Sequence, residues 1–327
     1  MNSKRNYSIC SIIRAITKSD FIMKFWKYCF RIVVGIFALI GVLAVCAYWY
    51  LASSEKYYIS IGENEVITKE AEFVDLLKQS PFKADTVQYH FAIVQDSARA
   101  REIMDYFKLD TLYRADASTW EKAVAISRFV ATSIPHVNSG NLPEHRNAID
   151  LWKFTKEEDS GFNCRMHAIL NYELMQAAGL TARFVTCMPQ DKNDGDCHVV
   201  NEVWLPELGK WAFIDSDMDG HYCTDQNGTP LNLLEMRDKY AAGEQMVMYP
   251  GFEKGTTKHD YYYCYMAKNT YWFSSWETLH YFQEDRADKD FEPGHYVNIV
   301  PEGFTPFGRS DDEVVTTDAK KFWANPE

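Results

Sequence analysis

The sequence predicts an α+β fold that follows a single membrane-spanning helix. Three observations predict it: an apolar run without charged side chains at residues 32–51, helix-typical segments between residues 97 and 179, and β-prone segments between residues 182 and 215. With 327 residues, of which 46% are hydrophobic, the chain can bury the core of one large or two modest domains.

The apolar run "IVVGIFALIGVLAVCAYWYL" predicts a transmembrane helix at residues 32–51. At the helical rise its twenty residues cover roughly 30 Å, the thickness of a bilayer's hydrocarbon layer. The first 31 residues hold seven Lys or Arg residues, which predicts a cytoplasmic N-terminus and places the chain after residue 52 outside the cytoplasm, which is the periplasm if the cell is Gram-negative. A cleaved signal peptide is the alternative, since small residues follow at 52–54; the long leader favours a retained anchor.

Charge is distributed unevenly along the chain. The formal net charge is −12, and it becomes −18 for the part beyond residue 31. A body this acidic repels phosphate backbones, so we expect no nucleic-acid partner.

The organisation that we expect has five parts. They are a basic leader at 1–31, the transmembrane helix at 32–51, a linker with extended segments ("YYISIG", "VQYHFAIV") at 52–95, the main domain at 96–236 and an aromatic-rich C-terminal part at 237–327. The last part is either an extension of the same domain or a small accessory region. Its "YYYCYM" and "YWFSSW" stretches are typical of strands with one buried face, and stacking on sugars is the alternative.

Helices are expected at residues 97–109 and 118–134, and a third begins at Cys164 and ends at Gly179. Ser118 and Glu121 have the spacing of a capping box. The second helix carries an apolar stripe that packs inward: Ala123, Ile126, Val130 and Ile134.

A candidate active site follows from the position of Cys164 in the first turn of its helix. Unpaired N–H groups and the positive end of the helix dipole favour the thiolate there. In the hairpin formed by "HVVNEVWLPELGKWAFID", a turn centred near Leu208 places Asp215 opposite Val200, on the face that His198 shares. Cys164, His198 and Asp215 then form a Cys-His-Asp triad.

The residues 118–236 resemble the transglutaminase-like superfamily of papain-type thiol enzymes, in a bacterial, membrane-anchored form. "GFNCRMHAILNYELMQAAGLTARFV" looks like the cysteine helix of that family, and the hairpin looks like its histidine hairpin. The resemblance implies a core in which the cysteine helix packs on an antiparallel sheet. It also implies a nucleophile at Cys164, a general base and acid at His198 and an orienting carboxylate at Asp215. The implied chemistry is acyl transfer from, or hydrolysis of, a protein or peptide amide, with cell-envelope material as one candidate substrate and with no cofactor or metal.

Calcium binding is a competing interpretation of Asp215. "DSDMDG" at residues 215–220 matches the start of a calcium loop, but Gln226 stands where a bidentate glutamate is required. We therefore expect Asp217→Asn and Asp219→Asn to change the rate of catalysis little.

Other polar residues admit weaker interpretations. Zinc ligation is one reading of Cys187, Cys197, His221 and Cys223, although their irregular spacing favours disulfides or free thiols, with Cys264 as a further partner. His167 either lines the site or is structural, and Asn147 and Trp152 are weak candidates for a second oxyanion donor. The functional alternative is a membrane-anchored, non-catalytic binding module on the same fold.

Overall fold

The computed structural model describes residues 25–27, 29–46, 73–138, 142–158, 160–218, 220–249, 260–289, 291 and 294–326, without the side chains of residues 260 and 264. It consists of two units, Met1–Glu65 and Val66–Glu327.

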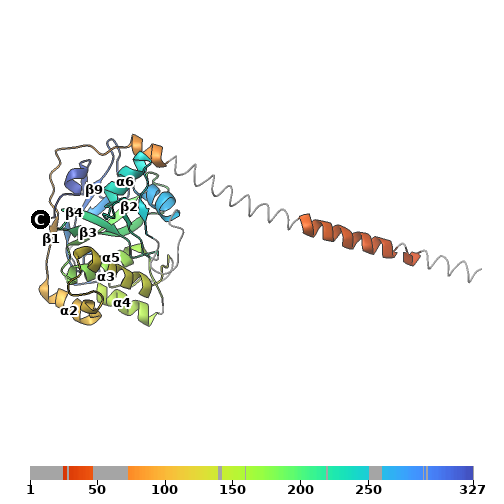
Figure 1. Cartoon of the computed structure of the whole chain (residues 1–327), viewed down its shortest axis with the longest axis horizontal. Coiled ribbons are helices and arrows are strands. Elements are labelled where there is room, and N and C mark those ends of the chain that lie inside the picture. The colour runs from red at the N-terminus through yellow and green to blue at the C-terminus, as the bar shows by residue number, and fades with distance from the viewer. Residues whose placement is uncertain are drawn as a thin grey trace, which may run out of the picture. The chain divides into compact units, whose positions relative to one another are not determined.

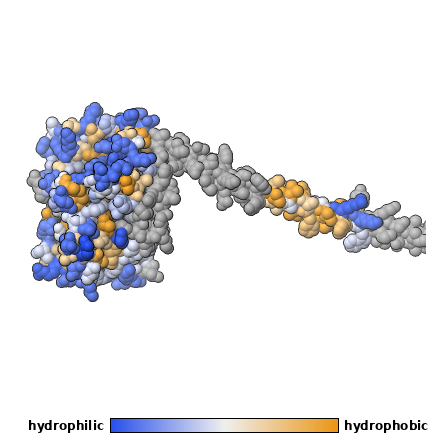
Figure 2. All heavy atoms as spheres, in the orientation of Figure 1, coloured by the Kyte–Doolittle hydropathy of each residue, from blue (hydrophilic) through white to orange (hydrophobic). Residues whose placement is uncertain are grey.

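The first unit contains one apolar helix, Phe25–Cys46, which is long and apolar enough to cross a membrane. Figure 2 shows it as hydrophobic over most of its described length, with a hydrophilic start. A signal sequence near an N-terminus has the same length and composition, so the helix fits both interpretations of the sequence. It begins before the predicted residue 32, and residues 47–51 of the prediction, like the "YYISIG" segment, lie outside the described residues.

The second unit is built on a six-stranded sheet with the order β10-β9-β7-β2-β3-β4, which confirms the α+β class (Figure 1). Its strands are β2 (Ala182–Met188), β3 (His198–Leu205), β4 (Lys210–Ile214), β7 (Trp272–Trp276), β9 (Tyr296–Ile299) and β10 (Val314–Thr316). Neighbours are antiparallel except for β9 and β10. The C-terminal strands β7, β9 and β10 thus belong to the same sheet as β2, β3 and β4.

The hairpin of β3 and β4 has the predicted register. Asn201 lies opposite Ile214 and Leu205 opposite Lys210, so the next pair along the ladder is Val200 and Asp215. The tight turn uses Gly209 at φ +62°, a conformation that glycine adopts without steric cost.

The helix α5 (Cys164–Ala177) packs between β2 and β3 on one side and three helices on the other. Those helices are α2 (Ser97–Phe107), α3 (Thr119–Ser133) and α4 (Ala148–Glu157), visible below the sheet in Figure 1. Every residue of α5 from Met166 to Ala177 is buried, so the helix is enclosed on all sides rather than on one inner face. Its polar side chains are therefore paired: Asn171 donates to Asn201 at 2.9 Å and to Ser127 at 3.0 Å.

Side-chain caps explain where the outer helices begin. Asp96 caps α2, Ser118 and Glu121 close the predicted capping box on α3, and Asn147 caps α4. The first helix ends two residues earlier than predicted, because Lys108 adopts a left-handed conformation and starts the short 3₁₀ helix η1 (Leu109–Thr111).

A second core covers the opposite face of the sheet. It is formed by a helical segment at residues 73–79, α6 (Leu233–Ala242), the π-helix η2 (Asp260–Met266), α7 (Ala267–Asn269) and α8 (Ala319–Phe322). The strand predicted at "YYYCYM" is wrong, because these residues lie in the π-helix η2, in which the consecutive Tyr261 and Tyr262 are both buried. The "YWFSSW" stretch does form a strand, β7, with all five residues buried.

Two short ladders complete the unit. β1 (Ala92–Ile93) pairs with β8 (Thr278–Leu279), and β5 (Cys223–Thr224) pairs with β6 (Val247–Met248). Of the extended segments predicted at 52–95, the structure thus shows a strand at β1, while residues 73–79 are helical.

Candidate active site

Cys164 is the first residue of α5, as predicted, and its side chain is half-buried. Asn163 caps the helix by accepting a hydrogen bond from the Met166 N–H at 3.3 Å. The preceding loop requires glycine at residue 161, because a Cβ there would lie 1.8 Å from the Pro135 carbonyl oxygen. This close approach holds residues 135–137 beside the start of the cysteine helix.

His198 opens β3 and is oriented by Asp215 at the end of β4. The Nε2–H of His198 donates to Oδ2 of Asp215 at 2.7 Å, and both side chains are buried. Burial opposes a charged ring, but attraction to Asp215 and to the sulfur of Cys164 outweighs it and raises the pKa of His198 well above its usual value. The environment therefore favours the imidazolium.

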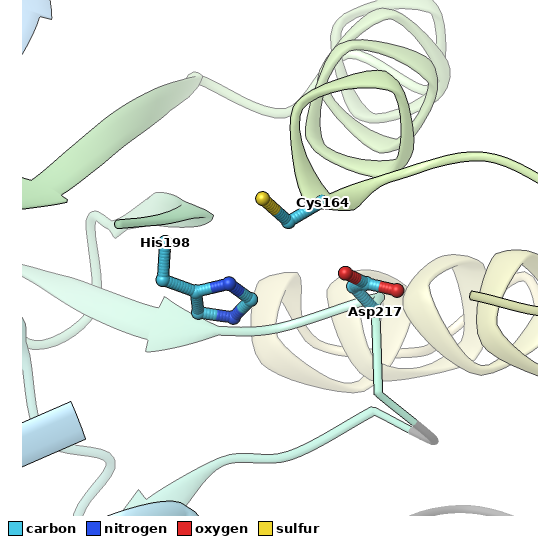
Figure 3. A group of neighbouring side chains, drawn as sticks. All are labelled: Cys164, His198 and Asp217. Atoms are coloured by element: carbon cyan, nitrogen blue, oxygen red, sulfur yellow. The ribbon is translucent and has the colours of Figure 1, made fainter. Parts of the chain in front are cut away.

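Cys164, His198 and Asp217 converge from three segments (Figure 3). The sulfur of Cys164, one ring nitrogen of His198 and one carboxylate oxygen of Asp217 all lie within 4.8 Å of one another. Asp215 occupies Nε2, so Nδ1 is the ring nitrogen left to face the sulfur. In space, the imidazole thus lies between the thiol and the Asp215 carboxylate, which is the order that a nucleophile, a base and an orienting group require.

Asp217 belongs to this site, although the sequence analysis had placed it outside. Its buried carboxylate accepts from Nδ1–H of His136 at 2.8 and 2.9 Å, and Nε2 of His167 lies 3.4 Å from it. Burial raises the pKa of Asp217, but the histidines outweigh burial and lower it. The hydrogen bond that His136 donates to Asp217 in turn raises the pKa of His136. A second His-Asp pair therefore lies beside Cys164.

Local geometry explains how Asp217 and His136 reach the site. The Asp217 N–H donates to Oδ1 of Asp215 at 2.8 Å, a turn that brings the second carboxylate back toward the first. His136 forms an isolated parallel bridge with Phe162, two residues before Cys164. The Asp-x-Asp spacing was the available signal for Asp217, whereas His136 stands in a loop with no periodic pattern.

His167 lies behind the site, where it contacts Asp217 and supports the backbone. It is buried one turn beyond Cys164, and its Nδ1–H donates to the Ser216 carbonyl oxygen at 3.0 Å. This bond fixes the backbone between Asp215 and Asp217.

The π-helix η2 supplies two tyrosines to the site that the sequence analysis missed. The Tyr261 hydroxyl donates to Oδ2 of Asp215 at 2.6 Å, and burial raises the pKa of Tyr261 well above its usual value, so it remains a neutral donor. The Tyr265 ring meets His198 edge-on with 5.0 Å between ring centroids, and its hydroxyl donates to the Cys197 carbonyl oxygen at 3.1 Å. The sequence predicted a strand at these residues, so it gave no signal that the two tyrosines share one side of a helix.

C-terminal residues hold the side chain of Arg165, the residue that follows Cys164. Arg165 donates to Oε1 of Glu284 at 2.8 Å, and the same oxygen accepts from Trp276 and Tyr296, each at 3.0 Å. Residues of β7 and β9 are therefore connected through Glu284 to the first turn of the cysteine helix.

The structure does not support the calcium interpretation in the described residues. Oδ2 of Asp215 accepts from His198 and Tyr261, and its Oδ1 accepts from the Asp217 N–H, so the carboxylate that would begin a calcium loop is directed toward the imidazole and the tyrosine. Asp219 lies outside the described residues.

The other proposed polar sets are not assembled within the part of the chain that the structure describes. Cys187, Cys197 and Cys223 are free thiols and do not gather with His221, while the Cys264 side chain is not described. Asn147 is a wrong candidate for an oxyanion donor, because its amide donates to Asp150 and Asp285. Trp152 stacks on Phe129 with 5.1 Å between ring centroids, in the aromatic packing of α4.

A cysteine that faces a histidine oriented by an aspartate has the geometry of a nucleophile, a base and an orienting group. Residues 108–216 match the family model of the transglutaminase-like superfamily, so the chain contains a transglutaminase-like domain. Among curated proteins, none matches this chain.

Two solved structures are similar to part of this chain. One is a candidate cysteine protease from Cytophaga hutchinsonii, with 19% identity, a TM-score of 0.29, and coverage of 46% of this chain and 48% of that one. The other is a candidate protease from Parabacteroides distasonis ATCC 8503, with 14% identity, a TM-score of 0.25, and coverage of 44% of this chain and 26% of that one. The chain thus spans about half of the length of the first of these proteins and about a quarter of the length of the second.

Proposed function

We propose that this protein is a transglutaminase-like thiol enzyme that cleaves an amide through a thioester intermediate. The observation that carries the proposal is His198, whose Nε2–H is held by Asp215 at 2.7 Å while its other nitrogen faces Cys164. In this arrangement Cys164 is the nucleophile, His198 the general base and acid, and Asp215 the group that orients the ring.

The reaction begins with attack of the Cys164 thiolate on the carbonyl carbon of the amide. The tetrahedral intermediate collapses as the C–N bond breaks, and the His198 imidazolium gives its proton to the leaving nitrogen. A thioester on Cys164 remains. His198, now neutral, takes a proton from water or from a second amine, which attacks the thioester and releases the thiolate.

The start of α5 favours this chemistry electrostatically. The first N–H groups of a helix have no partner within the helix and carry the positive end of its dipole. They stabilise both the thiolate of Cys164 and the negative oxygen of the tetrahedral intermediate, for which the Cys164 N–H is one donor.

The proposed substrate is a protein or peptide amide, with cell-envelope material as one candidate source. This rests on the proposed location: the apolar helix Phe25–Cys46 anchors the protein in the membrane, and the leader's positive charges keep the N-terminus in the cytoplasm. The transglutaminase-like domain then faces the compartment outside.

The test is the relative reactivity of the cysteines. The native protein is treated with a limiting amount of iodoacetamide at pH 7, and alkylation of each cysteine is followed by mass spectrometry. We expect Cys164 to react faster than the half-buried Cys197, whose pKa is raised by burial and by the charge of Cys164.

Two variants separate catalysis from folding. Cys164→Ala should abolish release of ammonia or amine from glutamine-containing peptides, whereas the matched variant Cys197→Ser should retain it. Assays with and without an added primary amine distinguish transfer from hydrolysis. Equal alkylation of Cys164 and Cys197, or full turnover by Cys164→Ala, would overturn the proposal in favour of a non-catalytic binding module.

A further inference from the structure

The side chains of Cys164, His198 and Asp217 also make up a set of metal ligands. We propose that they bind one Zn²⁺ ion, which occupies the thiol and thereby blocks its reaction. The binding itself depends only on the geometry, while its inhibitory effect rests on the proposed function.

The spacing of the three ligand atoms fits this ion after small side-chain movements. A tetrahedral Zn²⁺ with bonds of about 2.0–2.3 Å needs ligand atoms roughly 3.4–3.7 Å apart. In the structure the sulfur, nitrogen and oxygen atoms are all within 4.8 Å of one another. Side-chain rotations that move the ligand atoms by about an ångström bring them to the separation that zinc requires.

His198 is prepared as a ligand by its own hydrogen bond. Because its Nε2–H donates to Asp215, the ring offers Nδ1 to the ion, and binding displaces the proton that Nδ1 carries in the imidazolium. This Nδ1 atom is buried and makes no hydrogen bond within the described residues. A carboxylate behind a histidine is the arrangement that orients histidine ligands in zinc sites.

Asp217 can bind the ion without giving up His136. A carboxylate offers about four lone-pair positions, and the two contacts from His136 at 2.8 and 2.9 Å use part of them. His136 would then take the supporting role toward Asp217 that Asp215 takes toward His198.

The ligand types decide which class of ion fits. Thiolate and imidazole ligands suit Zn²⁺, whereas Ca²⁺ and Mg²⁺ require oxygen ligands. Three protein ligands leave one tetrahedral position for water, and the half-buried Cys164 leaves the site accessible.

The experiment uses the full-length protein without a polyhistidine tag, in detergent, after treatment with chelator. ZnCl₂ is titrated alone in a calorimeter, and iodoacetamide alkylation of Cys164 and Cys197 is measured at each point. We expect one ion per chain at the site, with protection of Cys164 and unchanged alkylation of Cys197. MgCl₂ and CaCl₂ should give neither binding nor protection.

Variants locate the ion. Loss of a supporting residue typically weakens metal binding about 10–100-fold. Asp217→Asn and Cys164→Ser, which alter direct ligands, should therefore weaken Zn²⁺ binding at least that much, and Asp215→Asn should act within that range. Cys197→Ser is the matched control and should bind as the native chain does, with melting curves verifying that each variant is folded.

The results separate this inference from the proposed function. Zn²⁺ affinity that is equal in native protein, Cys164→Ser and Asp217→Asn would overturn it, as would Zn²⁺ binding that leaves Cys164 alkylation unchanged. If zinc binds at these residues but the protein turns over no amide, the metal site stands and the proposed enzymatic function fails. If turnover depends on Cys164 but zinc does not bind, the enzymatic function stands and the metal site fails.

Discussion

The Tyr261 hydroxyl lies 2.6 Å from Oδ2 of Asp215, the same oxygen that binds His198 at 2.7 Å. A tyrosine that follows the hairpin by 46 residues therefore helps to fix the carboxylate that fixes the imidazole.

The first prediction concerns this hydroxyl. Tyr261→Phe removes one hydrogen bond to a charged acceptor, an interaction worth about 1.5–3 kcal/mol. With Asp215 less firmly held, we expect the rate of Cys164 alkylation at pH 7 to fall about 10-fold or more, measured by mass spectrometry. Tyr262→Phe is the control, because its hydroxyl donates at 2.5 Å to the Tyr222 carbonyl oxygen instead. Equal effects of the two variants would contradict the role of Tyr261.

The second prediction tests Asp215 directly. Asp215→Asn places an amide where the carboxylate accepted the Nε2–H of His198, which favours the wrong tautomer of the ring. Amidation of a triad aspartate in a serine protease lowers kcat by about 10⁴, and we expect a loss of that order here. Asp225→Asn, in an exposed turn, should turn over amide at the native rate. Turnover by Asp215→Asn within 10-fold of native would contradict the triad.

The third prediction is a pH dependence of stability from Glu173. Burial raises the pKa of this carboxyl from 4.5 to about 7, although the N–H groups of Ala148 and Phe282 act in the opposite direction. The folded state therefore binds the Glu173 proton more tightly than the unfolded state does. The resulting stabilisation is fully present below about pH 4.5 and is lost as the pH rises through 7. The shift corresponds to about 3 kcal/mol.

The measurement compares urea unfolding of the native protein and Glu173→Gln between pH 4.5 and pH 8. Relative to the variant, the native protein should lose about 3 kcal/mol of unfolding free energy over this range. A difference between the two proteins that stays constant with pH would contradict the prediction.

The fourth prediction concerns the buried ion pair of Arg183 and Glu202. Nε and Nη2 of Arg183 donate to Oε2 of Glu202 at 3.1 and 2.7 Å, and Nη1 donates to the Phe322 carbonyl oxygen at 2.9 Å. Glu202→Ala leaves an uncompensated buried charge, so the free energy of unfolding should fall by about 3–5 kcal/mol.

Chemical denaturation measures this effect, with the exposed Glu207→Ala as the control. A loss below about 1 kcal/mol for Glu202→Ala would contradict the prediction.

The fifth prediction concerns topology. A reporter that is active only outside the cytoplasm, fused after residue 327, should be active, because the positive leader holds the N-terminus inside. A reporter that is active only in the cytoplasm should be inactive at the same position. The reverse result would overturn the proposed orientation.

Local patterns were sufficient to predict the elements around the candidate site. The capping box of Ser118 and Glu121, the helix start at Cys164 and the strand period that brings His198 and Asp215 together all depend on residues close in sequence. Each was predictable because its physical cause acts within one helix turn or one hairpin. The catalytic roles of these residues remain a prediction.

Long-range pairing was not predictable in the same way. Asn171 and Glu173 look unsuited to the interior, and only their partners on other elements, such as Ser127 and the Ala148 N–H, explain their burial. His136 and Tyr261 come from a loop and a π-helix, neither of which has a sequence period that indicates its position in the fold. Strand order also has no local signal, so the position of β7 beside β2 could not be foreseen.

The position of β2 in the sheet has a consequence during synthesis. One neighbour of β2, the strand β3, emerges soon after it, but the other, β7, begins about 80 residues later. At roughly 5–20 residues per second, the ribosome needs about 4–16 s to make that stretch. The thiol of Cys164 is therefore made well before β7 and the tyrosines of η2, and the nascent chain passes through a period in which this thiol exists without the segments that complete the folded domain.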